Sequence, residues 1–186
     1  ELQNVVNVAV INATQSLAIV VDFAEQNTAG LSPTTAGYVG TTPTLITYLN
    51  AGVSGITASQ VGAINDALAT QPVDGAHVST TAKLQAVADA YLAVIGLADG
   101  FGNTPSHTSV LAGQYTQLGV SDLDPNASAT AHKITLLNDV IDRKVYADID
   151  TVFEIQTLLD GVSTLLDTAA GGNALTLAQL SALGFD

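Results

Sequence analysis

Apolar residues recur at three- and four-residue steps along most of this chain, which is the spacing of a helix with one buried face. One such stripe covers residues 84–98 and another covers residues 155–166. The N-terminal segment, residues 5–11, is rich in valine and would also suit a strand, because β-branched side chains favour strands. Its alignment with the two clear stripes predicts a helix there too.

That alignment rests on a block, here called block C, that occurs three times. Each copy opens with a charged residue, an aliphatic residue and glutamine, and the copies start at Glu1, Lys83 and Glu154. An apolar position and a polar position then stay in step downstream. The polar position holds Asn7, Asp89 and Asp160.

Two further blocks repeat in a fixed order relative to block C. Block B runs over residues 61–68 and again over 134–141, with an Asn-Asp pair in both copies. Block A reads Tyr-x-x-x-Gly-Val-Ser at Tyr48 and Tyr115, and residues 179–184 echo it in part. The order along the chain is C, A-B-C, A-B-C, A, with a period of roughly 65 to 75 residues.

This order predicts an all-α fold in which tandem three-helix repeats pack as a helical array or bundle of about seven to eight helices. The expected parts are a C helix of a preceding repeat, two full repeats and an A helix of a following repeat. They cover residues 1–30, 43–100, 106–170 and 174–186.

Capping residues agree with these helices. Thr57 is expected to open block B as a capping box, and Thr80 or Thr81 to precede the second copy of block C. Pro43 suits the first turn of the first A helix. Two glycines are expected to end the A helices in the left-handed conformation, namely Gly52 and Gly119.

The composition is that of a chain with a packed core, since hydrophobic residues make up 47% and charged residues 11%. The net charge of −13 arises because the chain has only four basic residues. Nucleic-acid binding is therefore excluded and binding to anionic membrane surfaces is disfavoured. Cysteine, methionine and tryptophan are absent, which suits an extracellular protein.

The two ends add two expectations. The first residue is Glu1 rather than methionine, which indicates a processed product or an excised fragment. The most apolar stretch, Val5 to Val21, is interrupted by several amide and hydroxyl side chains. We therefore expect neither a membrane span nor a signal peptide there.

The histidines and acids give no clear metal site. His77, His107 and His132 stand far apart and are expected at the surface or in loops. Residues 122–128 begin like a calcium loop, with oxygen ligands at alternate positions, but Ala127 and Lys133 stand where glycine and glutamate are needed. A turn with an Asp or Ser cap for the next helix is the expected structure.

A second acidic cluster, Asp148, Asp150 and Glu154, is expected to place negative charge at a helix N-terminus. Ser54 lacks the preceding strand and the spacing of a nucleophile elbow. No catalytic, cofactor or metal residue is therefore assigned, and the prediction is a non-enzymatic protein. An enzyme with two convergent carboxylates stays as a third alternative. Tyr48 and Tyr115 are expected in the core, whereas Tyr38 lies in a loop where it suits a glycan contact.

The sequence of residues 48–57 and 61–68 resembles the alanine-rich tandem repeats of giant secreted bacterial surface proteins and adhesins. Those proteins are commonly exported by type I secretion, like RTX proteins. The resemblance covers most of residues 43–100, extends more loosely over 108–170 and partially to both ends. It implies an extracellular, cell-surface location and a role in spacing, adhesion or self-assembly into filaments. The expected partners are other copies or neighbouring repeats, head to tail, and cell-surface glycans are a further candidate. The alternative is a glycan- or calcium-binding surface module.

Overall fold

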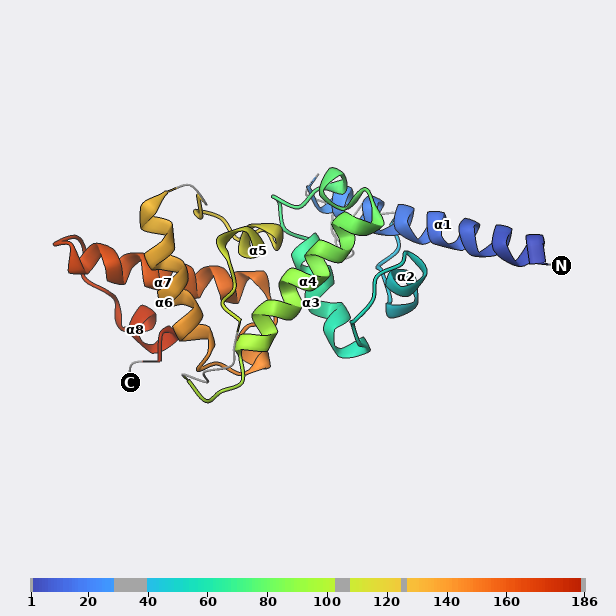
Figure 1. Cartoon of the computed structure of the whole chain (residues 1–186). Coiled ribbons are helices and arrows are strands. Elements are labelled where there is room, and N and C mark those ends of the chain that lie inside the picture. The colour runs from blue at the N-terminus through green and yellow to red at the C-terminus, as the bar shows by residue number, and fades with distance from the viewer. Residues whose placement is uncertain (1, 29–39, 103–107, 125–126, 185–186) are drawn as a thin grey trace. The chain divides into compact units, whose positions relative to one another are not determined.

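A computed structural model describes residues 2–28, 40–102, 108–124 and 127–184. These residues form eight α-helices and three short 3-10 helices, with no β-strand among them, which confirms the all-α prediction (Figure 1). The long helices are α1 (Leu2–Thr28), α4 (Thr81–Leu97), α6 (Ser128–Ile141) and α7 (Val152–Ala169). The shorter ones are α2 (Leu45–Asn50), α3 (Val61–Leu68), α5 (Ala112–Gln117) and α8 (Leu177–Ala182).

The predicted blocks correspond to these helices one by one. Helices α1, α4 and α7 carry block C, helices α3 and α6 carry block B, and helices α2, α5 and α8 carry block A. The 3-10 helices are η1 (Ala58–Gln60), η2 (Gly75–Val78) and η3 (Tyr146–Asp148), and they occupy connections between blocks. The ambiguous N-terminal segment is helical, as its alignment with α4 and α7 predicts.

The chain divides into two compact units. The first unit comprises Glu1–Tyr91 and Gln117–Gly119, and the second comprises Leu92–Thr116 and Val120–Asp186. The division falls inside α4, so a compact unit is not the same stretch of chain as a sequence repeat.

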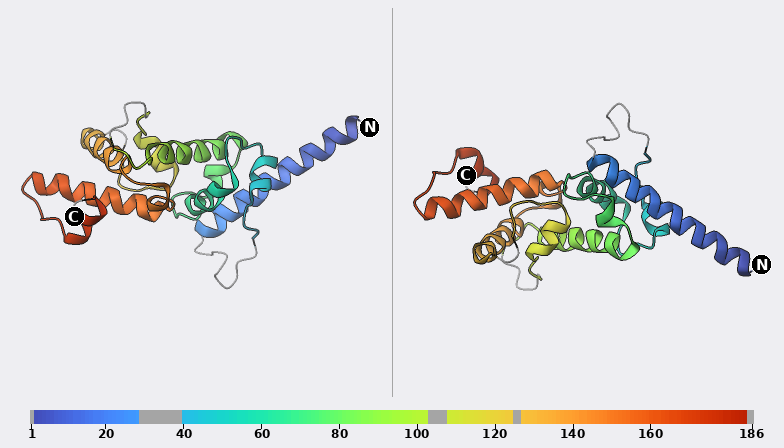
Figure 2. Two further views of the ribbon diagram at one scale, coloured as in Figure 1. Left: turned by 90° about the horizontal axis from the view of Figure 1, so that it is seen from below. Right: turned by 90° about the horizontal axis from the view of Figure 1, so that it is seen from above.

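The core of the first unit forms where the C-terminal half of α1 packs against α2 and η2. Val20, Phe23 and Ala24 of α1 are fully or almost fully buried there. The N-terminal half of α1 extends beyond α2 and α3 (Figures 1 and 2). Its apolar side chains are exposed, so this one helix is half core and half surface.

In the second unit α7 is the central helix, and it contacts both α6 and α8. Ile155, Leu159 and Val162 of α7 are buried completely. On the α8 side, Gly161 leaves room for Leu183, whose side chain lies 3.3 Å from the place a Cβ atom would occupy on that glycine. Small and large side chains thus interlock across the α7–α8 contact.

Most of the expected caps are confirmed. Thr57 donates its backbone N–H to the Gln60 side chain at 2.7 Å, as in a capping box, but it caps the 3-10 helix η1 that leads into α3 rather than α3 itself. Thr80 Oγ1 accepts from the Lys83 N–H at the start of α4. Gly52 and Gly119 have φ of +91° and +90°, so both follow their A helices in the left-handed conformation.

Two cap predictions are wrong. Pro43 lies before α2 rather than in its first turn, because Thr44 is the N-cap and closes a reciprocal box with Thr47. Helix α6 begins at Ser128 with Ala127 as its N-cap, and an alanine side chain has no oxygen to accept the orphan N–H groups. The expected Asp or Ser cap of this helix is therefore replaced by an alanine.

Segment Val5–Gln26 of α1 is long and apolar enough to cross a membrane by length and composition, with a mean hydropathy of 1.6. The core helix of a soluble protein and a signal sequence meet the same criteria. The expectation that this segment does not enter a membrane stays a prediction.

Candidate functional site: a repeated set of interhelical hydrogen bonds

Polar side chains join the A helix to the B helix in the first unit. The Tyr48 hydroxyl of α2 donates to Asn65 Oδ1 of α3 at 2.5 Å, and Asn65 Nδ2 donates to the carbonyl oxygen of Pro43 at 3.0 Å. Tyr48 is fully buried, so its hydroxyl needs such a partner. Asn65 of α3 therefore connects α2 with the chain segment that leads into α2. We call this arrangement the A–B tie.

The second unit contains the same A–B tie, atom for atom. The Tyr115 hydroxyl of α5 donates to Asn138 Oδ1 of α6 at 2.6 Å, and Asn138 Nδ2 donates to the Val110 carbonyl oxygen at 2.9 Å. Burial raises the pKa of the Tyr48 and Tyr115 phenols well above the usual range, because desolvation disfavours the phenolate. Both tyrosines are core residues, as their repeat positions predicted.

A second set of hydrogen bonds joins the turn after the A helix to the second turn of the following C helix. In the first unit Ser54 N–H donates to Gln85 Oε1 of α4 at 2.8 Å. Gln85 Nε2 in turn donates to the Ser54 carbonyl oxygen at 3.2 Å and to Asp89 Oδ1 at 2.7 Å. The carboxylate of Asp89 thus orients the carboxamide that holds the turn. We call this arrangement the A–C clamp.

The second unit repeats the serine-to-glutamine and glutamine-to-aspartate bonds of the A–C clamp. Ser121 N–H donates to Gln156 Oε1 of α7 at 2.8 Å, and Gln156 Nε2 donates to Asp160 Oδ1 at 2.9 Å. The left-handed glycine two residues before each serine turns the chain so that the serine N–H reaches the glutamine. At Gly52 the fit is close, because an added Cβ atom would lie 2.8 Å from Thr81 Cγ2.

Helix α1 carries the C-helix half of a third clamp. Gln3 Nε2 donates to Asn7 Oδ1 at 3.0 Å, which is the same four-residue step as in α4 and α7. Within the described part of the chain, no backbone N–H donates to Gln3 Oε1, and Gln3 is exposed. The acceptor that holds a turn in the other two copies is therefore open to solvent.

Helix α8 carries the A-helix half of a third set. Its N-cap Thr176 donates its N–H to Gln179 Oε1 at 2.9 Å, as Thr44 does to Thr47 in α2 and Leu111 to Gln114 before α5. Gly184 follows α8 with a φ of +88°, like the other two glycines. Helix α8 is attached to α7 by Leu183 and by a hydrogen bond from Gln179 Nε2 to Thr164 Oγ1 at 3.1 Å.

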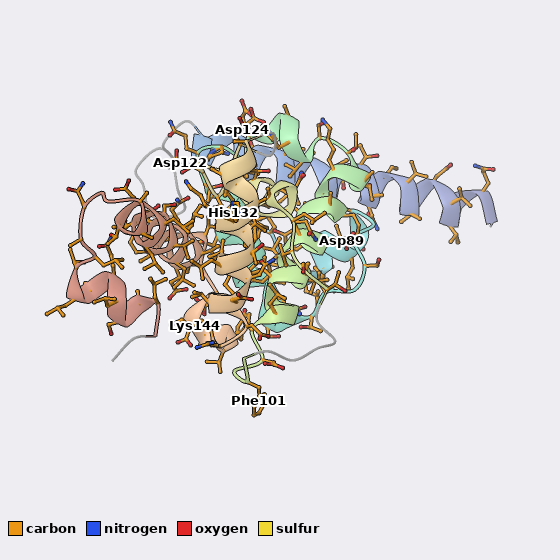
Figure 3. All side chains as sticks on the ribbon, turned by 60° about the vertical axis from the view of Figure 1, so that its left-hand side comes forward. Asp89, Phe101, Asp122, Asp124, His132 and Lys144 are labelled. Carbon is orange, nitrogen blue, oxygen red and sulfur yellow. The ribbon has the colours of Figure 1, made fainter. Side chains whose placement is uncertain are left out.

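The structure does not bring the histidines together. His77 contacts Asp74 at 2.6 Å beside η2, and hydrogen bonding from His77 holds the pKa of Asp74 below its usual range. His132 lies exposed along α6 (Figure 3). His107 and Tyr38 lie outside the described residues. Within the described ranges, no group of three or more His, Asp or Glu side chains is placed to hold a metal ion.

The acids after α5, Asp122 and Asp124, lie near one end of α6 (Figure 3). They line an open depression. Its lining combines three carboxylates with one amine and two hydroxyls: Asp122, Asp124, Asp160, Lys133, Ser163 and Thr164. Asp122 has a φ of +61°, the one non-glycine residue with positive φ in the described chain. The other acidic cluster acts in capping, since Glu154 accepts from the Thr151 N–H at 3.0 Å and Asp148 from the Val145 N–H at 3.1 Å.

Sequence reasoning found the repeats and missed what their polar residues do. The Asn-Asp pair of block B and the glutamine of block C are identical between the aligned copies of each block. Their recurrence in equivalent positions was the available signal, because a polar residue that repeats inside an apolar stripe has a partner more often than not.

No protein-family model matches this chain, and neither a curated protein nor a solved structure is similar to it. The resemblance to adhesin repeats therefore stays an expectation that rests on the amino-acid sequence of residues 43–100.

Proposed function

We propose that this chain is a structural, non-enzymatic module, a spacer or self-assembling element of an extracellular bacterial surface protein. The observation that carries the proposal is the recurrence of the A–B tie and the A–C clamp in both units. Repetition of the contacts that hold helices to one another is the property of repeat arrays, in which each unit is stabilised by its neighbours.

The arrangement gives such a module a mechanical role. Helix α2 contacts α1, and the turn after α2 is clamped to α4. Thr81 Oγ1 also donates to the Ala51 carbonyl oxygen at 2.7 Å, which adds a second bond at the same joint. A pulling force along the chain is therefore shared between apolar packing and several hydrogen bonds at each joint.

The location at the cell surface follows from the resemblance of residues 43–100 and is tested directly. An antibody against residues 43–170 should label intact cells of the bacterium that encodes the chain. Protease added outside those cells should remove the signal. Labelling that appears only after the cells are permeabilised would overturn the proposed location.

The alternative function, a calcium- or glycan-binding surface module, has the depression lined by Asp122, Asp124 and Asp160 in its favour. Carboxylates are the type of ligand that calcium prefers, although these three are not placed together as a ready-made metal site in the described residues. If calcium binds there, millimolar calcium should raise the melting temperature, and Asp124→Asn should abolish the rise while the exposed Asp139→Asn leaves it intact. An unchanged melting temperature, with no heat in calorimetry against calcium or a glycan panel, eliminates this alternative.

A further inference from the structure

We infer that the N-terminal half of α1 is the binding surface for an A–B helix pair of a neighbouring repeat, a pair of the kind formed by α2 with α3 and by α5 with α6. This inference rests on the proposed function, because a spacer built of repeats needs a joint between one repeat and the next. Two features of α1 carry it: an apolar face that continues a buried one, and a glutamine acceptor on another side of the helix.

The apolar face of α1 runs along the whole helix. In the C-terminal half it carries three side chains that are buried where α1 packs against α2 and η2, namely Val20, Phe23 and Ala24. With about 3.6 residues per turn, the same side of the N-terminal half carries Val5, Val6 and Ala9. Val5 and Val6 expose 66% and 48% of their surface, and Ala9 is exposed as well. Single exposed apolar residues are common, but a row that continues a buried face indicates an interaction site.

The positions equivalent to Val5, Val6 and Ala9 are buried in the other two C helices. The alignment that places Gln3, Gln85 and Gln156 at one position gives these equivalents: Val87, Ala88 and Tyr91 in α4, and Leu158, Leu159 and Val162 in α7. None of these six side chains exposes more than 4% of its surface. Both helices follow an A–B pair in the chain, so the face is covered wherever such a pair stands before the C helix.

The second unit shows how an A–B pair covers a C helix. The turn after α5 is bound to Gln156 of α7, whereas the following helix, α8, is attached to α7 at Gly161 and Thr164. None of these three residues lies on the side of α7 that corresponds to Val5, Val6 and Ala9. Helix α6 also packs against α7, and we assign it to that apolar side. The A helix thus supplies a turn at the glutamine, and the B helix covers the apolar face.

The glutamine side of α1 is open in the same way as its apolar face. Gln3 and Asn7 lie on a different side of α1 from the valines, so a turn bound to Gln3 alone would leave the apolar face in water. Asn7 holds the Gln3 carboxamide as Asp89 holds that of Gln85, and no backbone N–H of the described residues donates to Gln3 Oε1. Helix α1 therefore lacks both contacts that an A–B pair makes, and only a pair of helices supplies both.

A second copy of this chain is the weaker occupant. Both described A–B pairs are already engaged, because the turn after α2 is bound to α4 and the turn after α5 is bound to α7. A second copy would have to open one of its own joints to offer a pair. The partner is therefore a further A–B pair, and the contact is the joint of a tandem array.

A bilayer also fits less well. Val20, Phe23 and Ala24 hold the C-terminal half of α1 in the core, so only residues 2–15 extend from it. At 1.5 Å per residue this segment is about 21 Å long, whereas the hydrocarbon core of a membrane is about 30 Å thick. The amides of Asn7 and Asn12 would also enter hydrocarbon without an obligatory partner.

The first experiment supplies the missing pair. Residues 40–82 are placed directly before Glu1 of the full chain, which restores the block order A-B-C because Lys83 and Glu1 share one position. Amides of residues 5–13 should exchange about tenfold more slowly or slower still in the extended chain, since the added pair buries that half of α1. An extension by residues 108–153 restores the same order before Glu1 and should give the same slowing, so the result does not depend on one added pair.

The second experiment compares one substitution in the two chains. Val5→Gln should leave the melting temperature of the original chain unchanged, because Val5 is exposed there. In the extended chain it should lower the melting temperature by several degrees and speed up exchange of residues 5–13, because the glutamine loses its hydration in an apolar contact. The matched control is Ile46→Gln on α2, which removes a side chain of similar exposure, 63%, and should leave both chains unchanged. Its equivalents in α5 and α8, Gly113 and Ala178, are exposed as well.

Unchanged exchange of residues 5–13 in both extended chains would overturn the inference, and so would an equal effect of Val5→Gln with and without the added pair. Dimerisation of the original chain that Val5→Gln abolishes would assign the face to a second copy. Binding to phosphatidylcholine vesicles that Val5→Gln abolishes would assign it to a bilayer, and either result overturns the inference. The proposed function fails separately, in the intact-cell labelling, so a labelled protein whose α1 is not protected would remain a spacer without this joint.

Discussion

The Tyr48 hydroxyl and the Asn65 carboxamide meet at 2.5 Å inside the first unit, and Asn65 passes the connection on to the backbone carbonyl of Pro43. Two helices and the chain segment leading into the first of them are held by this single carboxamide. The same relationship joins Tyr115, Asn138 and Val110 in the second unit. The asparagine is thus the residue on which the spacing of the A and B helices depends.

Asn65→Ala should destabilise the protein by about 1–3 kcal/mol, because it leaves the buried Tyr48 hydroxyl without its acceptor and the Pro43 carbonyl without its donor. Asn138→Ala should cost a similar amount in the second unit. Denaturant unfolding of each variant measures the effect. The control is the exposed Asn50→Ala, which should stay within about 0.5 kcal/mol of the wild type. Equal losses for Asn50→Ala and Asn65→Ala would contradict the role of the tie.

The buried tyrosines predict a loss of stability at alkaline pH. Burial raises the folded-state pKa of Tyr48 and Tyr115 above the unfolded value of about 10, so their contribution is complete below that pH. As the pH rises beyond it, the unfolded chain releases protons that the folded chain retains. The free energy of unfolding should then fall by about 1.4 kcal/mol per pH unit for each tyrosine.

Tyr48→Phe isolates one of these two contributions. At pH 7 it should be less stable than the wild type, because Asn65 loses its donor. Between about pH 10 and pH 11 the gap should narrow by about 1 kcal/mol, since the variant has one proton fewer to lose on unfolding and the unfolded phenol is only half ionised at pH 10. Urea unfolding at pH 7, 10 and 11 gives both values, and a gap that does not change with pH would argue against burial of this phenol.

The A–C clamp can be tested with a natural matched pair. Gln85→Ala removes the acceptor of the Ser54 N–H and the donor to Asp89, and should cost about 0.5–1.5 kcal/mol. Gln3→Ala removes the same side chain from the same position of α1, where no described backbone N–H is bound to it. In dilute solution it should therefore have almost no effect on the melting temperature. A Gln3→Ala loss as large as that of Gln85→Ala would show that this glutamine stabilises its helix and not a joint.

The two glycines that follow α2 and α8 should differ in their tolerance of alanine. Gly184→Ala should cost about 1–2 kcal/mol, because its φ of +88° is strained for a residue with a Cβ atom and none of the described residues lies within 4 Å of that atom. Gly52→Ala should cost more, because its Cβ would also press against Thr81 Cγ2 at 2.8 Å. Thr81→Ser keeps the hydroxyl that donates to Ala51 and removes that methyl group, so it should recover part of the extra loss.

The helices themselves were predictable, because block B coincides with α3 and the apolar stripes of α4 and α7 fall on buried faces. The repeat alignment also resolved the valine-rich segment as part of α1, where local propensity favoured a strand. Intrinsic propensity determines secondary structure less strongly than an apolar pattern that is consistent over many residues.

The interhelical hydrogen bonds could not be predicted from the sequence, for a physical reason. An asparagine shared by two repeats suits an exposed position as well as a buried one, and only the three-dimensional packing decides which carbonyl it meets. Asn65 bonds to Pro43, which lies in a part of the chain predicted to be helical and found to be an extended lead-in to Thr44. The exposure of the N-terminal half of α1 could not be predicted either, because its sequence aligns with α4 and α7, in which the equivalent apolar side chains are buried.

Helix α2 contacts the C helix before it, and the turn after it is bound to the C helix that follows, so the joints of the first unit do not coincide with the ends of a sequence repeat. A gene duplication that starts at any point of the period and ends one period later would regenerate every joint intact. The number of repeats in such a protein can then grow or shrink by recombination without a single side chain being redesigned.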